Sequence, residues 1–269
     1  MALRRRRRRG SGRREAASIE ELVVHIAEDK SRSRFRPVAP GTERPREVFL
    51  DAVQLLVQPL EELGFTYARS GPHATRRRGH VISKVHFGSS YLDVPGELVS
   101  LSISIGIHDR TMGAWRKADE HSRRADDLVS TMHLGHLLDP PVALDWNLAD
   151  RAKRPATIAD AAATIHRHAM PFIEDITQLL AAPDLEPERL ASLVESEALV
   201  EYFVRSGRLD EAGALVSSYL AGFPEGILVR LHAQIARFRS EGLPEATDPD
   251  AGDWLAFLVV RHELPTRFP

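Results

Sequence analysis

The sequence contains no cysteine. This absence excludes disulfide bonds, thiolate zinc sites, iron–sulfur clusters and cysteine nucleophiles, and it is typical of a reducing compartment. Long apolar runs are also missing, since no stretch approaches the roughly 20 residues that cross a bilayer. We therefore expect a soluble, cytoplasmic protein with no membrane span. Because 43% of its 269 residues are hydrophobic, the chain has enough apolar material for a packed core.

Lysine is scarce, and much of the positive charge is arginine near the start of the chain. Residues 1–46 carry a net charge of +8, whereas residues 47–269 carry −10. The charges of a dense arginine block repel one another, and the block has few apolar side chains that could form a core. Residues 1–45 are therefore expected to form a basic, largely disordered tail and linker. Acidic residues follow the block instead of the apolar segment of a secretory signal, so we expect no export signal.

The arginine block is also a candidate anion-binding segment. Its members are Arg4, Arg5, Arg6, Arg7, Arg8, Arg9, Arg13 and Arg14. Such a cluster attracts phosphate backbones without regard to sequence, and the attraction falls steeply with salt. The rest of the chain has neither a basic groove nor the spaced aromatic residues that stack bases. Nucleic acid is therefore expected only as a weak partner through the tail, and a solvated charge run is the interpretation we favour.

The middle of the chain predicts an α+β domain over residues 46–182. Residues 46–63 and 157–181 carry apolar residues at helical spacing. Four strand patterns lie between them, at residues 65–69, 74–77, 80–87 and 98–108. In the last strand apolar residues alternate with serine and glycine, so one face is buried and the other is polar. We expect an antiparallel meander sheet whose buried face, including Ile103, packs on the two helices.

Further elements are expected after these strands. Residues 115–133 have apolar residues at helical spacing, which predicts a helix, and residues 142–146 predict a short edge strand. From residue 183 to residue 269 the patterns predict a small all-helical domain. Its helices are expected at residues 187–206, 209–221, 225–239 and 254–262. One piece resembles half a tetratricopeptide unit, but a stable repeat array needs about three units.

The polar face of the predicted sheet gathers a set of candidate binding residues. If Phe87 lies opposite Val99, the histidines and lysine of the strand at residues 80–87 lie beside the serines of the strand at residues 98–108 on this face. The set comprises His80, Lys84, His86, Ser100, Ser102, Ser104 and His108. A serine nucleophile with a histidine base on this face would make a hydrolase-like enzyme. A solvated sheet face explains the same alternation without any chemistry.

Motifs that bind metals, cofactors or nucleotides are absent from the sequence. There is no glycine-rich phosphate loop, no His-Glu-x-x-His and no Gly-x-Ser-x-Gly. His133 and His136 are three residues apart, but no third ligand stands at a motif spacing. Residues 76–78 are three arginines at a predicted turn, where they are either hydrated or bound to an anion. We therefore expect no metal and no cofactor.

Several short segments resemble, in their order, a known bacterial family. They are Val48-Phe49, Leu63-Gly64-Phe65, Ile105-Gly106-Ile107, a tryptophan near the end of the domain, and Met170-Pro171-Phe172. The arrangement is similar to the bacterial domain of unknown function numbered forty-three oh-four, over about residues 46–180. This resemblance implies an α+β domain with a meander sheet, and it transfers no catalytic residue.

The sequence as a whole favours a non-enzymatic binding or protein-interaction module. An acidic folded part, a polar sheet face and a helical segment offer surfaces to a protein partner that the sequence does not identify. The alternatives are a hydrolase-like enzyme on the polar face and a non-specific nucleic-acid binder that uses the arginine-rich tail.

Overall fold

The computed structural model describes residues 43–68, 70–119, 126–182, 185–243 and 251–266. The arginine block and its predicted disorder lie outside these residues. Within them, helices and a single sheet account for most of the chain, which confirms the α+β class and the helical C-terminal region.

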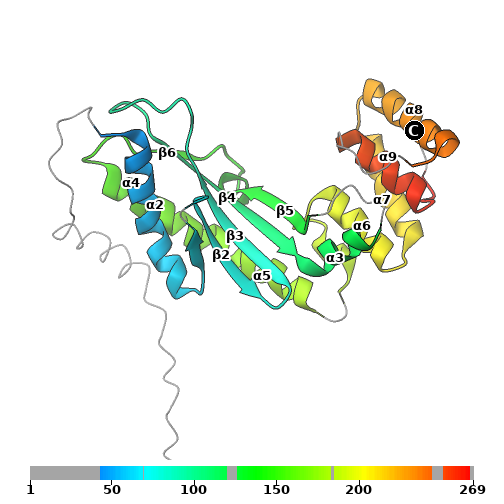
Figure 1. Cartoon of the computed structure of the whole chain (residues 1–269), viewed down its shortest axis with the longest axis horizontal. Helices are drawn as coiled ribbons and strands as arrows, with labels where there is room; N and C mark the ends of the chain where they lie inside the picture. Colours follow the sequence, from blue (N-terminus) through cyan, green and yellow to red (C-terminus); the bar gives the residue numbers. More distant parts are fainter. Residues whose placement is uncertain (1–42, 69, 120–125, 183–184, 244–250, 267–269) are drawn as a thin grey trace, which may run out of the picture.

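Six antiparallel strands form one sheet in the middle of the molecule (Figure 1). Five lie in sequence order: β1 (Thr66–Ala68), β2 (His73–Arg78), β3 (Val81–Gly88), β4 (Ser100–Asp109) and β5 (Leu128–His133). The sixth, β6 (Asp145–Asn147), pairs with the beginning of β4 and confirms the predicted edge strand. Strand β4 therefore pairs with three other strands.

The pairing of β3 with β4 differs from the register assumed from the sequence. Phe87 lies opposite Ile103 rather than Val99. The difference is four residues, and an even displacement leaves every side chain on its predicted face. The buried face is as expected, with Val85, Leu101 and Ile103 fully enclosed.

Three helices cover this buried face and share one hydrophobic core with it. They are α2 (Pro45–Glu62), α4 (Arg154–Thr164) and α5 (Met170–Ala181). Proline at the start of α2 suits the first turn, where its missing N–H is not needed. Apolar residues on one stripe of α2, including Phe49 and Leu56, are buried. The predicted packing of both long helices on this face of the sheet is thus observed.

The predicted helix at residues 157–181 is interrupted in the structure. Its two halves, α4 and α5, are joined by a π-helical turn, η3 (Ile165–Ala169). Pro171 stands just after this turn, and proline cannot donate the hydrogen bond that a regular helix needs at that place. The local widening of the helix accommodates the missing hydrogen bond.

The helix predicted at residues 115–133 is wrong. A shorter helix, α3 (Arg110–Ala118), overlaps only the first four residues of this range, and residues 128–133 form strand β5 instead. Asp109 begins α3 by accepting a hydrogen bond from the Thr111 N–H at 2.8 Å. The helical spacing further along was misleading because Val129 and Ser130 are buried by pairing of β5 with β4, and such tertiary contacts override local preference.

The C-terminal helices gather at one end of the sheet (Figure 1). They are η4 (Pro187–Leu190), α6 (Ser196–Arg205), α7 (Leu209–Ala221), α8 (Glu225–Glu241) and α9 (Ala251–Arg261). A short 3-10 turn, η2 (Leu134–Leu137), follows β5. The segment predicted as one helix at residues 187–206 is divided into η4 and α6.

A buried ion pair connects α6 to the sheet. Arg116 of α3 and Glu201 of α6 are both 0% exposed, and the Arg116 Nε lies 3.0 Å from the Glu201 Oε1. Arg116 Nη1 also donates to the backbone oxygen of Leu128, at 2.8 Å. The side chain of Arg116 therefore joins α3, α6 and the beginning of β5.

A second buried contact stands beside this ion pair. The hydroxyl of Tyr202 in α6 donates to the Asp109 Oδ2, at 2.8 Å. Burial, followed by the negative charge of Asp109, raises the pKa of Tyr202, so the hydroxyl keeps its proton and remains a donor.

Candidate functional site

The side of the sheet opposite α2 and α5 carries polar side chains, and we call it the open face. Its central residues are His73, Lys84, His86, Ser104, Gly106, His108, Thr131 and His133. Apart from Gly106, these residues are half-buried or exposed. Alternation along each strand places them together, since directly paired residues share a face.

Three histidines and a serine form a row across four strands of the open face. His73 of β2 pairs with His86 of β3, His86 pairs with Ser104 of β4, and Ser104 pairs with His133 of β5. The ring centroids of His73 and His86 are 5.4 Å apart. Beyond the strands, the His136 ring lies 5.8 Å from that of His133. The open face is thus rich in imidazole side chains.

Gly106 lies at the centre of the next row, between Lys84 and Thr131. It has no side chain to fill the space above it. A Cβ atom placed on Gly106 would lie 3.3 Å from the His86 Nε2 and 3.5 Å from the His108 Nε2. Both ring nitrogens therefore face the same small region above Gly106.

Asp127, which directly precedes β5, fixes the orientation of His108. The His108 Nδ1 lies 2.8 Å from the Asp127 Oδ1. Partial burial raises the pKa of Asp127, but the hydrogen bond and charge of His108 and the charge of Lys84 outweigh it, so the pKa is lowered overall. The carboxylate is ionised at neutral pH and can only accept. The hydrogen of the contact must then sit on His108 Nδ1, which leaves the Nε2 facing the region above Gly106.

His86 is surrounded by positive groups. Partial burial lowers its pKa, and the charges of His73, Lys84 and His108 lower it further. The ring is therefore mostly neutral at pH 7. Among the described residues, neither Lys84 nor His86 forms an ion pair with a carboxylate of the chain. Asp127 is the carboxylate that the structure places beside these groups, through its contact with His108.

Four of the predicted residues are close together on the open face, Ser100 and Ser102 lie further along the same face of β4, and His80 lies outside the sheet. Lys84, His86, Ser104 and His108 surround or adjoin Gly106. His80 stands in the turn between β2 and β3, and its Nε2 lies 2.9 Å from the Leu180 backbone oxygen, on the helix side. Its predicted place beside the serines is wrong because the strand begins one residue later, at Val81.

The two remaining serines point to other partners. The Ser100 hydroxyl donates to Asp93, and the Ser102 hydroxyl lies against Gly88. In the part of the chain that the structure describes, no serine hydroxyl is within hydrogen-bond distance of His108. The hydrolase-like alternative stays a prediction, and Ser104 and His86, which lie directly opposite each other on β4 and β3, are the serine and histidine nearest to the arrangement it needs.

The three arginines at the β2–β3 turn have a partner inside the protein. Arg76 and Arg78 both pair with Glu174 of α5, and the Arg76 Nη1 lies 2.6 Å from the Glu174 Oε1. Arg76 is buried, with its guanidinium over the Phe65 ring. Arg76 and Arg78 share the single carboxylate of Glu174, so this turn is a structural contact between the sheet and α5 that keeps a net positive charge.

Several open-face residues were missed by sequence reasoning. Thr131 and His133 were assigned to a helix, so they were not placed on the sheet. Asp127 could not be linked to His108, because residues 19 apart in sequence meet only through the pairing of β4 with β5. His73 lies one residue before the predicted strand at residues 74–77.

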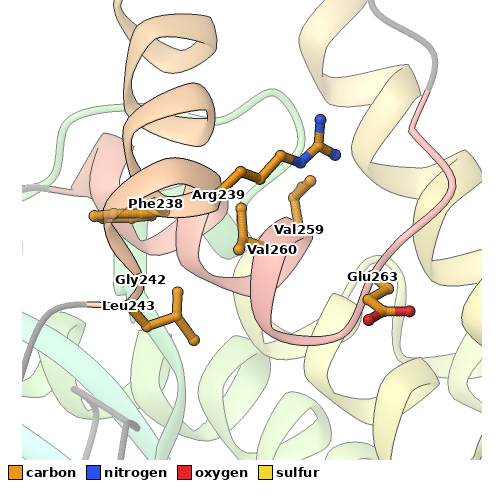
Figure 2. Close-up of a pocket in the computed structure, with 7 residues that line it drawn as sticks. All are labelled: Phe238, Arg239, Gly242, Leu243, Val259, Val260 and Glu263. Atoms are coloured by element: carbon orange, nitrogen blue, oxygen red, sulfur yellow. The ribbon is translucent and has the colours of Figure 1, made fainter.

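Two hollows lined by described residues lie away from the open face. One, of about 470 Å³, is formed by Phe238, Arg239, Gly242, Leu243, Val259, Val260 and Glu263 (Figure 2). The other, of about 480 Å³, is formed by Asp175, Gln178, Leu179, Ala182, Arg189 and Leu193. Neither contains a serine or a histidine, so neither joins a nucleophile to a base.

The described residues were compared with the requirements of a metal site and of a membrane-spanning helix. Among them, no three histidine, aspartate or glutamate side chains are close enough to hold a metal ion. No helix in the described ranges has the length and apolar character required to cross a bilayer.

Comparison of the chain with protein-family models, with curated proteins and with solved structures gives no match. The resemblance to the bacterial family named above stays a prediction, and function is argued from the geometry of the open face.

Proposed function

We propose that this protein is a non-enzymatic binding module whose open face binds an anionic group of a partner protein. The observation that supports this proposal most is the convergence of Lys84, His86 and His108 around Gly106. Among the described residues, Lys84, His86 and His108 share one neighbouring carboxylate, Asp127, so a bound anion would add negative charge where the chain supplies little. A cytoplasmic location is part of the proposal, because a cysteine-free chain suits a reducing compartment.

The surroundings of the site favour a protein as the carrier of this anionic group. The loop that joins β3 to β4 exposes Tyr91, Leu92 and Val94, which are 95%, 60% and 42% exposed. The loop is held in shape, since Asp93 accepts a hydrogen bond from the Ser100 N–H at 2.9 Å. Exposed apolar side chains on an ordered loop are typical of protein interfaces, and this loop lies where β3 ends and β4 begins, so a partner bound there would extend along the open face to reach Gly106.

Anion binding at the open face can be measured with simple probes. Acetate, sulfate and phosphate are titrated at constant ionic strength, with chloride as the reference, while the ring resonances of His86 and His108 are followed by NMR. We expect both resonances to shift saturably with at least one of the three anions. In Gly106→Val the new side chain displaces the His86 and His108 rings, because a Cβ would already lie 3.3 Å from the His86 Nε2, and we expect roughly tenfold weaker binding by a protein that still melts cooperatively.

A matched control is Thr75→Val. Thr75 lies on the same face and in the same row as Lys84 and Gly106, but on β2. This variant adds the same side chain to the open face without filling the site, so it should bind anions like the unmodified protein. Histidine resonances that ignore all three anions, or that respond equally in Gly106→Val, would contradict the proposed function.

A further inference from the structure

We infer that the open face binds an extended segment of a partner protein, whose apolar residue covers Val94 and Leu98 and whose carboxylates, about eight residues along, reach the region near Gly106. The inference rests on the proposed function, because it names the kind of partner whose anionic group the open face binds.

The open face continues beyond the first residue of β4. Val99, which directly precedes β4, is buried in the core on the helix side. By the alternation of an extended chain, Leu98 lies on the opposite side, in line with the serines of β4. Val94 and Leu98 form an antiparallel bridge, with backbone N–O distances of 2.7 and 3.0 Å. Paired residues share a face, so Val94 and Leu98 form an apolar pair at one end of the open face.

This apolar pair is exposed and fixed in place. Val94 is 42% exposed and Leu98 is 38% exposed. The Asn147 Nδ2 donates to the Glu97 backbone oxygen at 2.9 Å, and the Asn147 Oδ1 accepts from the Val99 N–H at 3.0 Å. Because the loop is already ordered, little conformational entropy is lost when a partner covers it. The pair is therefore suited to hold an apolar side chain of that partner.

A single line of residues joins the apolar pair to the region near Gly106. Gly106 is eight residues beyond Leu98, which is about 26 Å at the rise of an extended strand. The open-face residues between them are three serines, at positions 100, 102 and 104. Their side chains are too small to block a chain that lies along β4. Since an extended peptide has the same rise, about eight residues of a partner cover this distance.

Larger side chains flank this line of serines. Ser104 lies opposite His86 of β3 on one side and opposite His133 of β5 on the other. The two flanking strands are about 10 Å apart, whereas a helix with its side chains is about 10–12 Å wide. An extended chain is narrower than a helix, so it reaches the serines between the flanking side chains more easily.

The end of the open face near Gly106 is positive. Arg76 is buried on the helix side against Glu174, so alternation places the exposed Arg77 on the open face, in the row next to that of Lys84. Among the described residues, neither Arg77 nor Lys84 forms an ion pair with a carboxylate. Asp127 supplies one negative charge near Lys84. Carboxylates of a partner are therefore attracted to this end.

The end near the apolar pair is negative instead. The Asp93 carboxylate accepts a hydrogen bond from the Ser100 N–H at 2.9 Å, and Asp145 of β6 lies opposite Ser102 on the open face. These carboxylates repel those of a partner. The difference between the two ends sets the direction of the bound segment, with its apolar residue at the loop and its acidic residues near Gly106.

The test measures the binding of synthetic peptides to the full chain by fluorescence anisotropy. Each peptide carries one leucine and two glutamates, held four, eight or twenty residues apart by serine and threonine, and is made in both orders. An acid-only peptide lacks the leucine. We expect the eight-residue separation, in one of the two orders, to bind about tenfold more tightly than the acid-only peptide, because one segment then contacts both ends of the face.

The other two separations exclude different arrangements. Four residues reach at most about 14 Å, so that peptide should bind like the acid-only peptide. A flexible tether of twenty residues has a root-mean-square length of about 25 Å. Tightest binding at twenty would therefore show two separate sites joined by a tether, and it would overturn the extended segment.

A variant tests the apolar pair directly. In Val94→Ser we expect the peptide with the eight-residue separation to bind about tenfold more weakly, because its leucine loses the apolar surface that it covers. The matched control is Val229→Ser. Val229 is 62% exposed on α8, in the helical region away from the loop, so this variant should bind the peptide like the unmodified protein (Figure 1). The peptide series on the unmodified protein tests the inference even if Val94→Ser folds poorly.

The outcomes separate this inference from the proposed function. Equal affinity for the eight-residue and acid-only peptides, with both bound, overturns the extended segment and leaves an anion-binding face. Self-association that Val94→Ser abolishes, measured by sedimentation, would assign the apolar pair to a second copy of the chain and also overturn the inference. No response to any peptide or to acetate, sulfate and phosphate overturns both proposals.

Discussion

Replacing Ile103 with aspartate is expected to abolish the cooperative melting transition of the sheet. Ile103 is fully buried in the middle of β4, on the face covered by the helices. An unpaired carboxylate at such a place costs several kcal/mol, which is a large part of the roughly 5–15 kcal/mol that holds a domain of this kind together. Thermal unfolding followed by circular dichroism is the direct measurement.

The neighbouring residue provides the control for this prediction. Ser104→Asp introduces the same charge into the same strand, but on the open face between His86 and His133. We expect this variant to fold and melt cooperatively. An unchanged transition in Ile103→Asp, or equal damage from both variants, would show that the assignment of the two faces is wrong.

Replacing Arg116 with methionine is expected to destabilise the protein by about 3–5 kcal/mol, because it leaves the Glu201 carboxylate buried without its partner. Chemical denaturation would measure the loss. Amide hydrogen exchange in α6 should rise most, since the ion pair is where this helix meets α3. The double variant Arg116→Met, Glu201→Leu removes both charges and should recover much of the stability.

An exposed ion pair in the same part of the chain is the control. Arg208 pairs with Glu188 and Glu211 at the surface. Because such pairs are screened by solvent, Arg208→Met should leave the stability nearly unchanged. If Arg116→Met behaves like Arg208→Met, the buried pair does not hold α6 to the sheet.

The sequence predicts those parts of the fold whose pattern is local. Strand β4 was identified from its alternation, and α2 from its apolar stripe. Strand β5 was not, because its apolar residues also fit helical spacing and only pairing with β4 decides between the two. The same holds for the register of β3, where alternation fixes the faces but not the pairing partners.

The candidate site was predictable in part for the same reason. Alternation brought Lys84, His86 and His108 to one face of the sheet, and the structure confirms that placement. It could not show that Asp127 orients His108, since that contact depends on the pairing of β5. His80 was misplaced because the sequence does not reveal where a strand ends and its turn begins.

The pairing of β4 with three strands determines the order in which the molecule opens. Strand β1 has three residues and is bonded along one side, to β2, so it frays at little cost. The amide hydrogens of β4 are enclosed between β3 on one side and β5 and β6 on the other, and they exchange with solvent only when the whole sheet is lost. Since Gly106 and His108 belong to β4, the site lies in the slowest-opening part of the protein and stays assembled while the edges fluctuate.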